Sequence, residues 1–167
     1  MELMVGPAGF RGPDFGYNLP PPPGGVESYI IDRNIGGIEF SAFRVSPGGP
    51  GSVQWSYTLP SGAPAGRYGI RLTLEYTDVD PAPSFAGLLS IGLADPADDL
   101  TALPFALATD VQVQSVALPP PRMSVLEWEF ANAGPKPFVA CVLTKPTDPP
   151  FSGIIYLYQA TLNFLGE

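Results

Sequence analysis

Prolines and glycines interrupt this chain so often that long helices are excluded. The sequence has 22 prolines and 19 glycines among 167 residues. Proline breaks the interior of a helix and glycine destabilises it. Short strands joined by tight turns tolerate both, because each residue has a defined place in such turns. Since 45% of the residues are hydrophobic, a folded core is expected. The composition therefore predicts one all-β domain.

Hydrophobic residues recur at every second position in several segments, which is the signature of a half-buried strand. The pattern is clear in Val53–Leu59, Tyr68–Tyr76 and Leu126–Phe130. A helical turn is expected at Pro96–Leu103, with Asp95 as its N-cap. This number and spacing of strands favours an antiparallel β-sandwich, with a jelly roll as the leading candidate. Strands are predicted at residues 27–32, 37–45, 53–59, 68–76, 86–93, 111–118, 126–130, 137–144 and 153–164.

Residues 1–25 differ from the predicted sandwich of residues 26–167. They hold six prolines and six glycines, including the run Pro20–Pro23, which favours an extended polyproline conformation. We expect an N-terminal arm that anchors the protein to a partner, and three collagen-like triplets from Gly6 leave a triple-helical stub as an alternative. The large side chains of the arm are either anchors for the partner or a cover for the protein's own sandwich. They are Phe10, Arg11, Phe15, Tyr17 and Leu19.

The segment Gly153–Phe164 is apolar on both faces at its start. Ile155 and Leu157 lie opposite Ile154, Tyr156 and Tyr158 in a regular alternation. Such a strand is either central in its sheet or lies against a neighbouring subunit. Ile155 and Leu157 are therefore candidates for a subunit interface.

Charge and missing residue types exclude several function classes. The net charge is −8 with a pI near 4.3, so the surface repels phosphate and nucleic-acid binding is not expected. No apolar run approaches the roughly 20 residues of a membrane span, and no secretory signal is visible, so synthesis in the cytoplasm is expected. Without histidine, Ser-His-Asp and Cys-His systems are excluded. Cys141, the single cysteine, lies in an apolar run and is predicted to be buried. No cofactor is expected.

Carboxylate groups are the remaining candidates for site chemistry. Glu127 and Glu129 share one strand face, with their backbones roughly 6.5–7 Å apart. They are either a catalytic pair in a cleft or a solvated strand face. Acidic loops are either calcium ligands or solvated turns, and we predict no metal site. These loops contain Asp78 and Asp80, and Asp95, Asp98 and Asp99.

Trp55 and Trp128 each lie on the apolar side of an alternating strand. That position favours packing in the core. The alternative is that tryptophans and tyrosines form an exposed stacking platform for sugars, as in carbohydrate-binding modules.

Four segments in order resemble a group of jelly-roll proteins of tailed-phage virions, found as head fibres, decorations, and tail or neck appendages. They are Val53–Pro60, Arg67–Tyr76, Gly87–Leu93 and Gly153–Phe164. The resemblance covers roughly residues 38–165 and implies a homotrimer.

These observations together predict a non-enzymatic accessory protein of a bacteriophage virion, with head decoration or a head fibre favoured over a tail part. The expected partners are the major capsid protein or neighbouring appendage subunits, bound through the N-terminal arm. The expected location is the virion, after synthesis in the host cytoplasm. The alternative is a carbohydrate-binding β-sandwich module on a tail or head appendage, which binds a host surface glycan.

Overall fold

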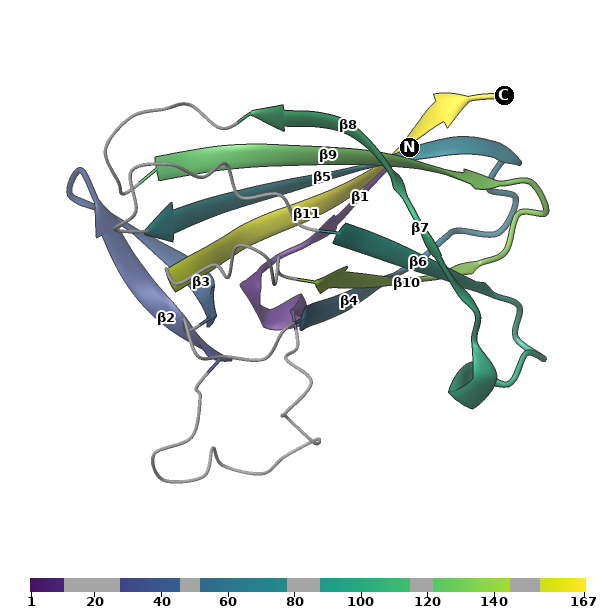
Figure 1. Ribbon diagram of the computed structural model, residues 1–167, viewed down its shortest axis with the longest axis horizontal. Coiled ribbons are helices and arrows are strands. Elements are labelled where there is room, and N and C mark those ends of the chain that lie inside the picture. The colour runs from purple at the N-terminus through teal and green to yellow at the C-terminus, as the bar shows by residue number, and fades with distance from the viewer. Residues whose placement is uncertain (11–27, 46–51, 78–87, 115–121, 145–153) are drawn as a thin grey trace.

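Two antiparallel sheets lie face to face in the computed structural model (Figure 1), which describes residues 1–10, 28–45, 52–77, 88–114, 122–144 and 154–167. The small sheet contains β4 (Ser52–Thr58), β10 (Phe138–Thr144), β6 (Leu88–Ala94) and β7 (Phe105–Leu107), in that order. The large sheet contains β2 (Ser28–Ile35), β3 (Ile38–Val45), β11 (Ile154–Gly166), β5 (Gly66–Thr77), β9 (Arg122–Asn132) and β8 (Thr109–Gln114), and β1 (Glu2–Val5) also pairs with β11.

The chain crosses repeatedly between the two sheets, as it does in a jelly roll. Strands β3, β5, β9 and β11 lie in the large sheet, and the strands β4, β6 and β10 that alternate with them lie in the small one. Strand β7 continues almost directly into β8 and so passes from the small sheet to the large (Figure 1). The predicted sandwich is confirmed. Within the described ranges, no helix is long and apolar enough to cross a membrane.

All nine predicted strands are present, and two short strands, β1 and β7, were not predicted. The predicted helical turn is a 3-10 helix that is confined to Leu100–Ala102. Its N-cap is Asp99 and not Asp95, because the Asp99 side chain accepts a hydrogen bond from the backbone N–H of Thr101.

The core lies between the sheets, where the inward side chains of their alternating strands meet. On β4 and β10 every second residue is buried. Trp55 and Trp128 are only 4% and 2% exposed, so both are core residues and neither forms a sugar platform. Cys141 is buried, as predicted, and burial raises the pKa of its thiol well above the usual value.

A β-bulge in β11 changes which of its side chains point into the core. The register against β5 shifts between Leu157 and Gln159. Ile155 and Leu157 point inward before the shift, and Ala160 and Leu162 point inward after it. Ile155 and Leu157 are 2% and 0% exposed in the chain's own core. The structure thus corrects the proposed subunit interface: β11 is apolar on both sides because it is a central strand.

The first ten residues belong to the sandwich. Strand β1 pairs with Ala160–Asn163 of β11, and a 3-10 turn at Pro7–Gly9 takes the place of the triple helix considered above. Phe10 is fully buried, and its ring lies 6.0 Å from Phe43 and 5.5 Å from Trp55. This placement corrects the predicted arm of residues 1–25, because residues 1–10 cover the protein's own core.

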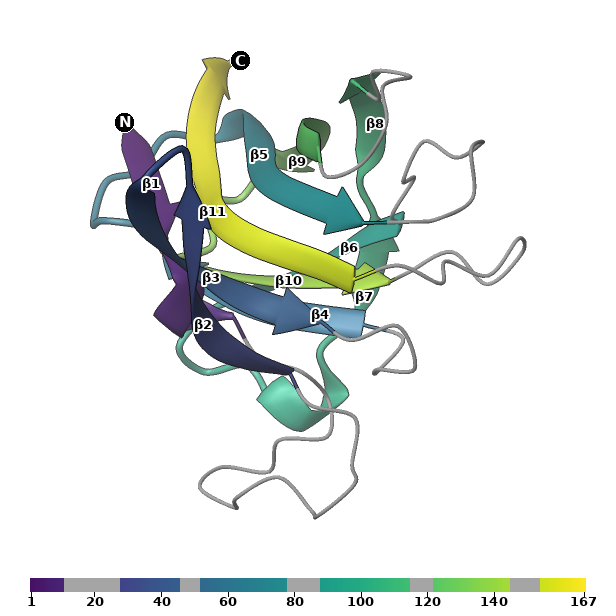
Figure 2. The ribbon, with the colours of Figure 1, turned by 90° about the vertical axis from the view of Figure 1, so that its left-hand side faces the viewer.

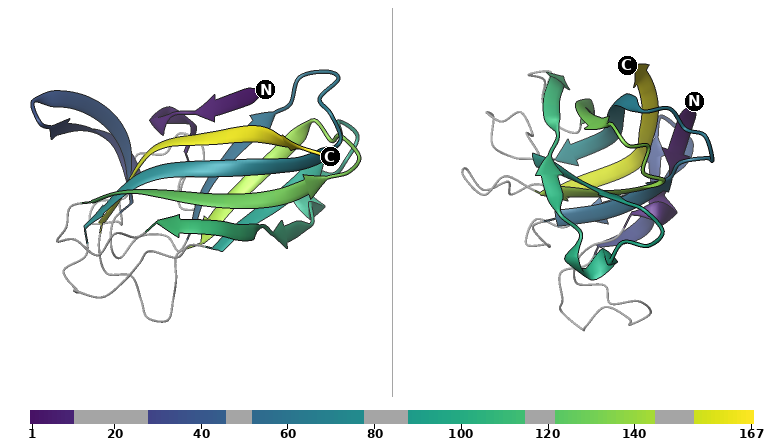
Figure 3. Two further views of the ribbon diagram at one scale, coloured as in Figure 1. Left: turned by 90° about the horizontal axis from the view of Figure 1, so that it is seen from above. Right: turned by 90° about the vertical axis from the view of Figure 1, so that its right-hand side faces the viewer.

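Strands β2 and β3 form a hairpin that projects from the body of the molecule (Figure 3, left). Its two-residue turn, Gly36-Gly37, has φ values of 62° and 84°, which require glycine in a type I′ turn. Only Phe43–Val45 at the base of β3 pair with β11. Farther along β11, strand β1 takes that position, and in the view of Figure 2 β1 and the hairpin lie on the same side of β11.

Candidate functional site

Although the net charge of the protein is −8, none of the described residues on the outer face of the small sheet is charged. Because the inward positions of β4 and β10 alternate with outward ones, the outward set follows from the strand register. We call this surface the neutral face. Its residues are Ser52, Gln54, Ser56, Thr58, Phe138, Ala140, Val142, Thr144, Leu88, Ser90, Gly92, Phe105 and Leu107.

One side of the neutral face is apolar and exposed. Leu88, Phe105 and Leu107 are 55%, 48% and 68% exposed. Leu107 lies opposite Ser90 in the β6–β7 ladder, and Phe105 lies opposite Gly92. A side chain at Gly92 would collide with Leu103 and Phe105, which cover that position. The neutral face therefore changes from small polar residues on β4 to large apolar ones on β7.

The outer face of the large sheet has the opposite character. Arg71 on β5 lies directly across from Glu127 on β9, and its Nε donates to Glu127 Oε1 over 2.6 Å. Arg67 reaches diagonally to Glu129, with 3.2 Å between Nη1 and Oε2. Each glutamate of the candidate carboxylate pair is therefore bound to an arginine on the outer face of the large sheet.

A groove of about 140 Å³ opens between these two ion pairs. Gly69 lies between Arg67 and Arg71 on β5, and the Leu165 side chain packs over it. Neighbouring strands place Glu129 on one side of Gly69 and Asn163 on the other. The groove is lined by Gly69, Ile70, Arg71, Glu127, Trp128, Glu129, Asn163 and Leu165.

A buried ion pair fastens the β2–β3 hairpin to the large sheet. Arg33 of the hairpin binds Glu75 of β5, with 2.5 Å between Nη2 and Oε1, and the Glu75 side chain is only 5% exposed. The Tyr158 hydroxyl donates to the second carboxylate oxygen over 2.7 Å. The Arg33 guanidinium lies 4.2 Å from the centre of the Tyr156 ring, a cation–π distance.

The pKa values of two side chains in this cluster, Arg33 and Tyr158, are raised. Hydrogen bonding to Glu75 raises the pKa of Arg33. Burial, followed by the Glu75 hydrogen bond and charge, raises the pKa of Tyr158 to about 12. Arg33 and Tyr158 therefore hold the Glu75 side chain between them and fasten the hairpin to β5.

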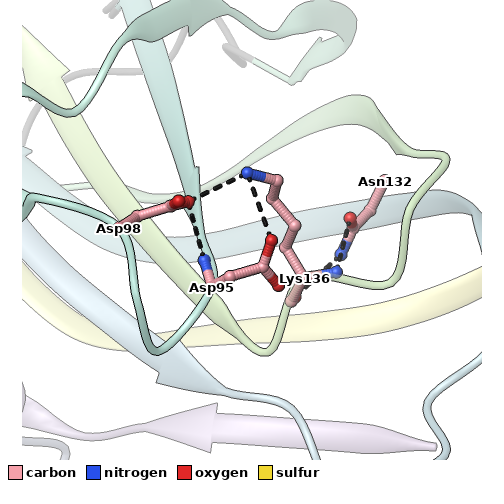
Figure 4. A network of polar contacts seen from close by, with 4 residues as sticks. All are labelled: Asp95, Asp98, Asn132 and Lys136. Atoms are coloured by element: carbon pink, nitrogen blue, oxygen red, sulfur yellow. Dashed lines mark hydrogen bonds and ion pairs between the residues drawn. The ribbon is translucent and has the colours of Figure 1, made fainter.

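A second network closes one end of the sandwich and occupies the acidic loop considered for calcium (Figure 4). Lys136 Nζ lies 3.0 Å from Asp98 and 3.5 Å from Asp95. Asp98 also accepts from the backbone N–H of Asp95, and these contacts lower the pKa of Asp98. Asn132 exchanges two hydrogen bonds with the backbone of Lys136. A lysine thus holds the carboxylates that a cation would need, and the described ranges contain no group of three potential metal ligands.

The structure separates the residues that the sequence suggested for binding. Phe10, Ile155 and Leu157 lie in the core, while Arg11, Phe15, Tyr17 and Leu19 lie outside the described residues, as do Asp78 and Asp80. Sequence reasoning missed both the neutral face and the groove. The signal for the first was the run of uncharged residues at alternate positions of 52–58 and 138–144. The signal for the second was a lone glycine, Gly69, within a strand pattern, which often marks a close approach or a hollow.

Comparison with known proteins shows the fold and no family. No protein-family model matches the chain, and no curated protein matches it. A structure of the CBM22-1 and GH10 modules of Clostridium thermocellum endo-1,4-beta-D-xylanase 10B, complexed with xylohexaose, is similar over 98% of this chain, with a TM-score of 0.56 and 10% identity. The enzymatically active domain of tailspike protein 4 of bacteriophage CBA120 also covers 98%, with a TM-score of 0.46 and 8% identity.

This chain spans 27% of the xylanase chain and 19% of the tailspike chain. Such distant likeness to the xylanase structure supports the β-sandwich fold, which many proteins of unrelated function share. Function therefore has to be argued from the surfaces of this chain.

Proposed function

We propose that this chain is a non-enzymatic structural accessory protein of a bacteriophage virion, and specifically a capsid decoration or head-fibre protein. The observation that carries the proposal is the neutral face. Interface centres are depleted of charged residues and enriched in aromatic ones, and contiguous exposed apolar residues commonly mark an interaction site.

Strand edges support the same conclusion. Edge strands that face water are normally protected by lysine, proline or a bulge. Both edges of the small sheet, β4 and β7, lack charged residues along their described length. A partner that covers the neutral face would shield these edges as well.

The partner that we propose is another virion protein, either the major capsid protein or a neighbouring appendage subunit. Residues 11–25 remain the proposed attachment segment, with Arg11, Phe15, Tyr17 and Leu19 as its anchors. In the sequence they lie between the 3-10 turn after β1 and strand β2, and both of these strands belong to the large sheet. We further propose that the protein is a homotrimer that resides in the virion after synthesis in the host cytoplasm.

Charge insertion into the neutral face tests the proposal. Ser56 is exposed at the middle of β4, and Ser61 is exposed in the turn that follows this strand. Ser56→Glu and Ser56→Lys should both reduce the copies of the chain on purified phage particles by about tenfold or more, counted by quantitative mass spectrometry. The same substitutions at Ser61 should leave the copy number unchanged.

Both signs of charge are needed in this test. A loss with glutamate alone would indicate simple repulsion from an acidic partner, and a loss with neither would remove the neutral face as the docking surface. Thermal unfolding of each purified variant distinguishes lost docking from lost folding.

A second candidate function, carbohydrate binding, is favoured by one specific observation, the groove over Gly69.

A further inference from the structure

We propose that the groove over Gly69 is a binding site for a single ring of a neutral saccharide. The proposal concerns the large sheet and does not depend on the neutral face or on attachment to a virion. It develops the second candidate function by naming the place and the chemistry of the ligand.

The groove exists because two arginines lean away from the glycine between them. Arg67 and Arg71 both reach toward β9, where Glu129 and Glu127 hold them. Nothing on β5 fills the intervening space at Gly69. A Cβ atom placed there would lie 3.2 Å from Leu165 Cδ1, so the Leu165 side chain packs over Gly69 as one wall of the groove, and a larger side chain at position 69 would crowd that wall.

Polar atoms around the groove are left without partners. The Asn163 side chain makes no hydrogen bond with any described residue. Glu127 and Glu129 each bind their arginine through one carboxylate oxygen, Oε1 in Glu127 and Oε2 in Glu129. The glutamate side chains are 26% and 31% exposed. Half-buried acceptors beside a free amide gain most from a ligand that can both donate and accept hydrogen bonds.

The charge balance selects a neutral ligand. Each glutamate that lines the groove is neutralised by its own arginine, Glu127 by Arg71 in the lining and Glu129 by Arg67 beside it. An anion therefore meets the two carboxylates, while a cation meets Arg71. A hydroxyl group donates to a carboxylate and accepts from a guanidinium without an ionic charge of its own. Vicinal hydroxyls on one ring present several such groups together.

One wall of the groove is apolar. Leu165 is 44% exposed beside Gly69, and it offers a surface for the C–H face of a sugar ring. The volume of about 140 Å³ is below the roughly 300–1,000 Å³ that is typical for drug-sized ligands. The site therefore accommodates one ring, either a monosaccharide or one unit of a longer chain, and millimolar affinity is expected.

Amide chemical-shift mapping on the isotope-labelled full chain tests this proposal. The probes are xylohexaose, cellohexaose and mannohexaose as neutral saccharides, with trigalacturonic acid as an acidic one, each at up to 10 mM. At least one neutral saccharide should shift the amides of Gly69, Glu129 and Asn163 in a saturable manner, and the acidic saccharide should shift them less.

Variants connect the shifts to the groove. Gly69→Val fills it and should weaken binding at least tenfold, and Asn163→Ala should weaken it about threefold to tenfold. Gly134→Ala is the matched glycine control, because a Cβ at that position meets nothing within 4 Å, and it should bind like the parent chain. Asn163→Ala keeps the test decisive if Gly69→Val fails to fold.

Three results would overturn the proposal: no shift of the groove amides by any neutral saccharide at 10 mM, equal or tighter binding of the acidic one, or binding that survives Asn163→Ala and a folded Gly69→Val. None of these results bears on whether the chain is found on phage particles, so the two proposals fail separately.

Discussion

Loss of the Arg33 guanidinium should destabilise this protein far more than loss of a surface arginine. Arg33→Ala leaves the Glu75 carboxylate, which is 5% exposed, with the Tyr158 hydroxyl as its one remaining partner in the part of the chain that the structure describes. Removal of one member of a fully buried pair costs roughly 3–5 kcal/mol, because the other charge stays buried without compensation.

The magnitude here should be somewhat lower. Arg33 is itself 27% exposed, so water reaches the vacated position, and Tyr158 still donates to the carboxylate. We expect a loss of about 2–3 kcal/mol in the free energy of unfolding. For a chain of this length, that loss corresponds to a fall in Tm of roughly 4–12 °C.

Thermal and urea unfolding followed by circular dichroism measure the effect. The matched control is Arg67→Ala, which breaks a pair whose side chains are 58% and 31% exposed and which should cost less than about 1 kcal/mol. Adding Glu75→Gln to Arg33→Ala should recover part of the loss, since it removes the buried charge. Equal effects of the two arginine variants, or no recovery in the double variant, would show that an unpaired Glu75 charge does not cause the loss of stability.

Three further changes test other parts of the fold. Burial raises the pKa of Tyr158 in the folded state to about 12, against roughly 10 in the unfolded state. The contribution of Tyr158 to the free energy of unfolding is therefore present below pH 10 and is lost as the pH rises from 10 to 12. Tyr158→Phe should flatten this decline in stability, as measured by urea unfolding at a series of pH values. The Tyr68 hydroxyl donates to the Pro64 carbonyl over 2.6 Å, so Tyr68→Phe should cost about 1–2 kcal/mol in urea unfolding, and an unchanged midpoint would show that the bond contributes nothing. Phe10→Ala should cost about 3–5 kcal/mol, whereas a near-neutral result would mean that residues 1–10 do not close the core.

Most of the strands could be predicted from the sequence because apolar and polar residues alternate along each of them, and this pattern is local. In β4 the alternation alone decides which face is buried, and the structure follows it. The bulge in β11 could not be predicted, because both alternating sets before it are apolar, with Ile154 and Tyr156 in one set and Ile155 and Leu157 in the other. The resulting error placed Leu157 on the wrong face.

Features that depend on distant strands were also missed. Glu75 lies on the polar side of the alternation in Tyr68–Tyr76, but the β2–β3 hairpin covers it and supplies Arg33 from 42 residues away. Strand β1 lies within residues 1–25, whose many prolines and glycines gave no strand pattern, and its pairing with β11 is a long-range contact. The groove over Gly69 arises from the joint placement of three strands, which no local pattern reports.

A structure of the purified phage particles by cryo-electron microscopy would test most directly whether the neutral face is a docking surface. We expect density for many copies of this sandwich on the virion, with β4, β10, β6 and β7 turned toward a neighbouring protein and the groove over Gly69 open to solvent. Particles that lack the chain, or copies whose small sheet faces water, would contradict this expectation.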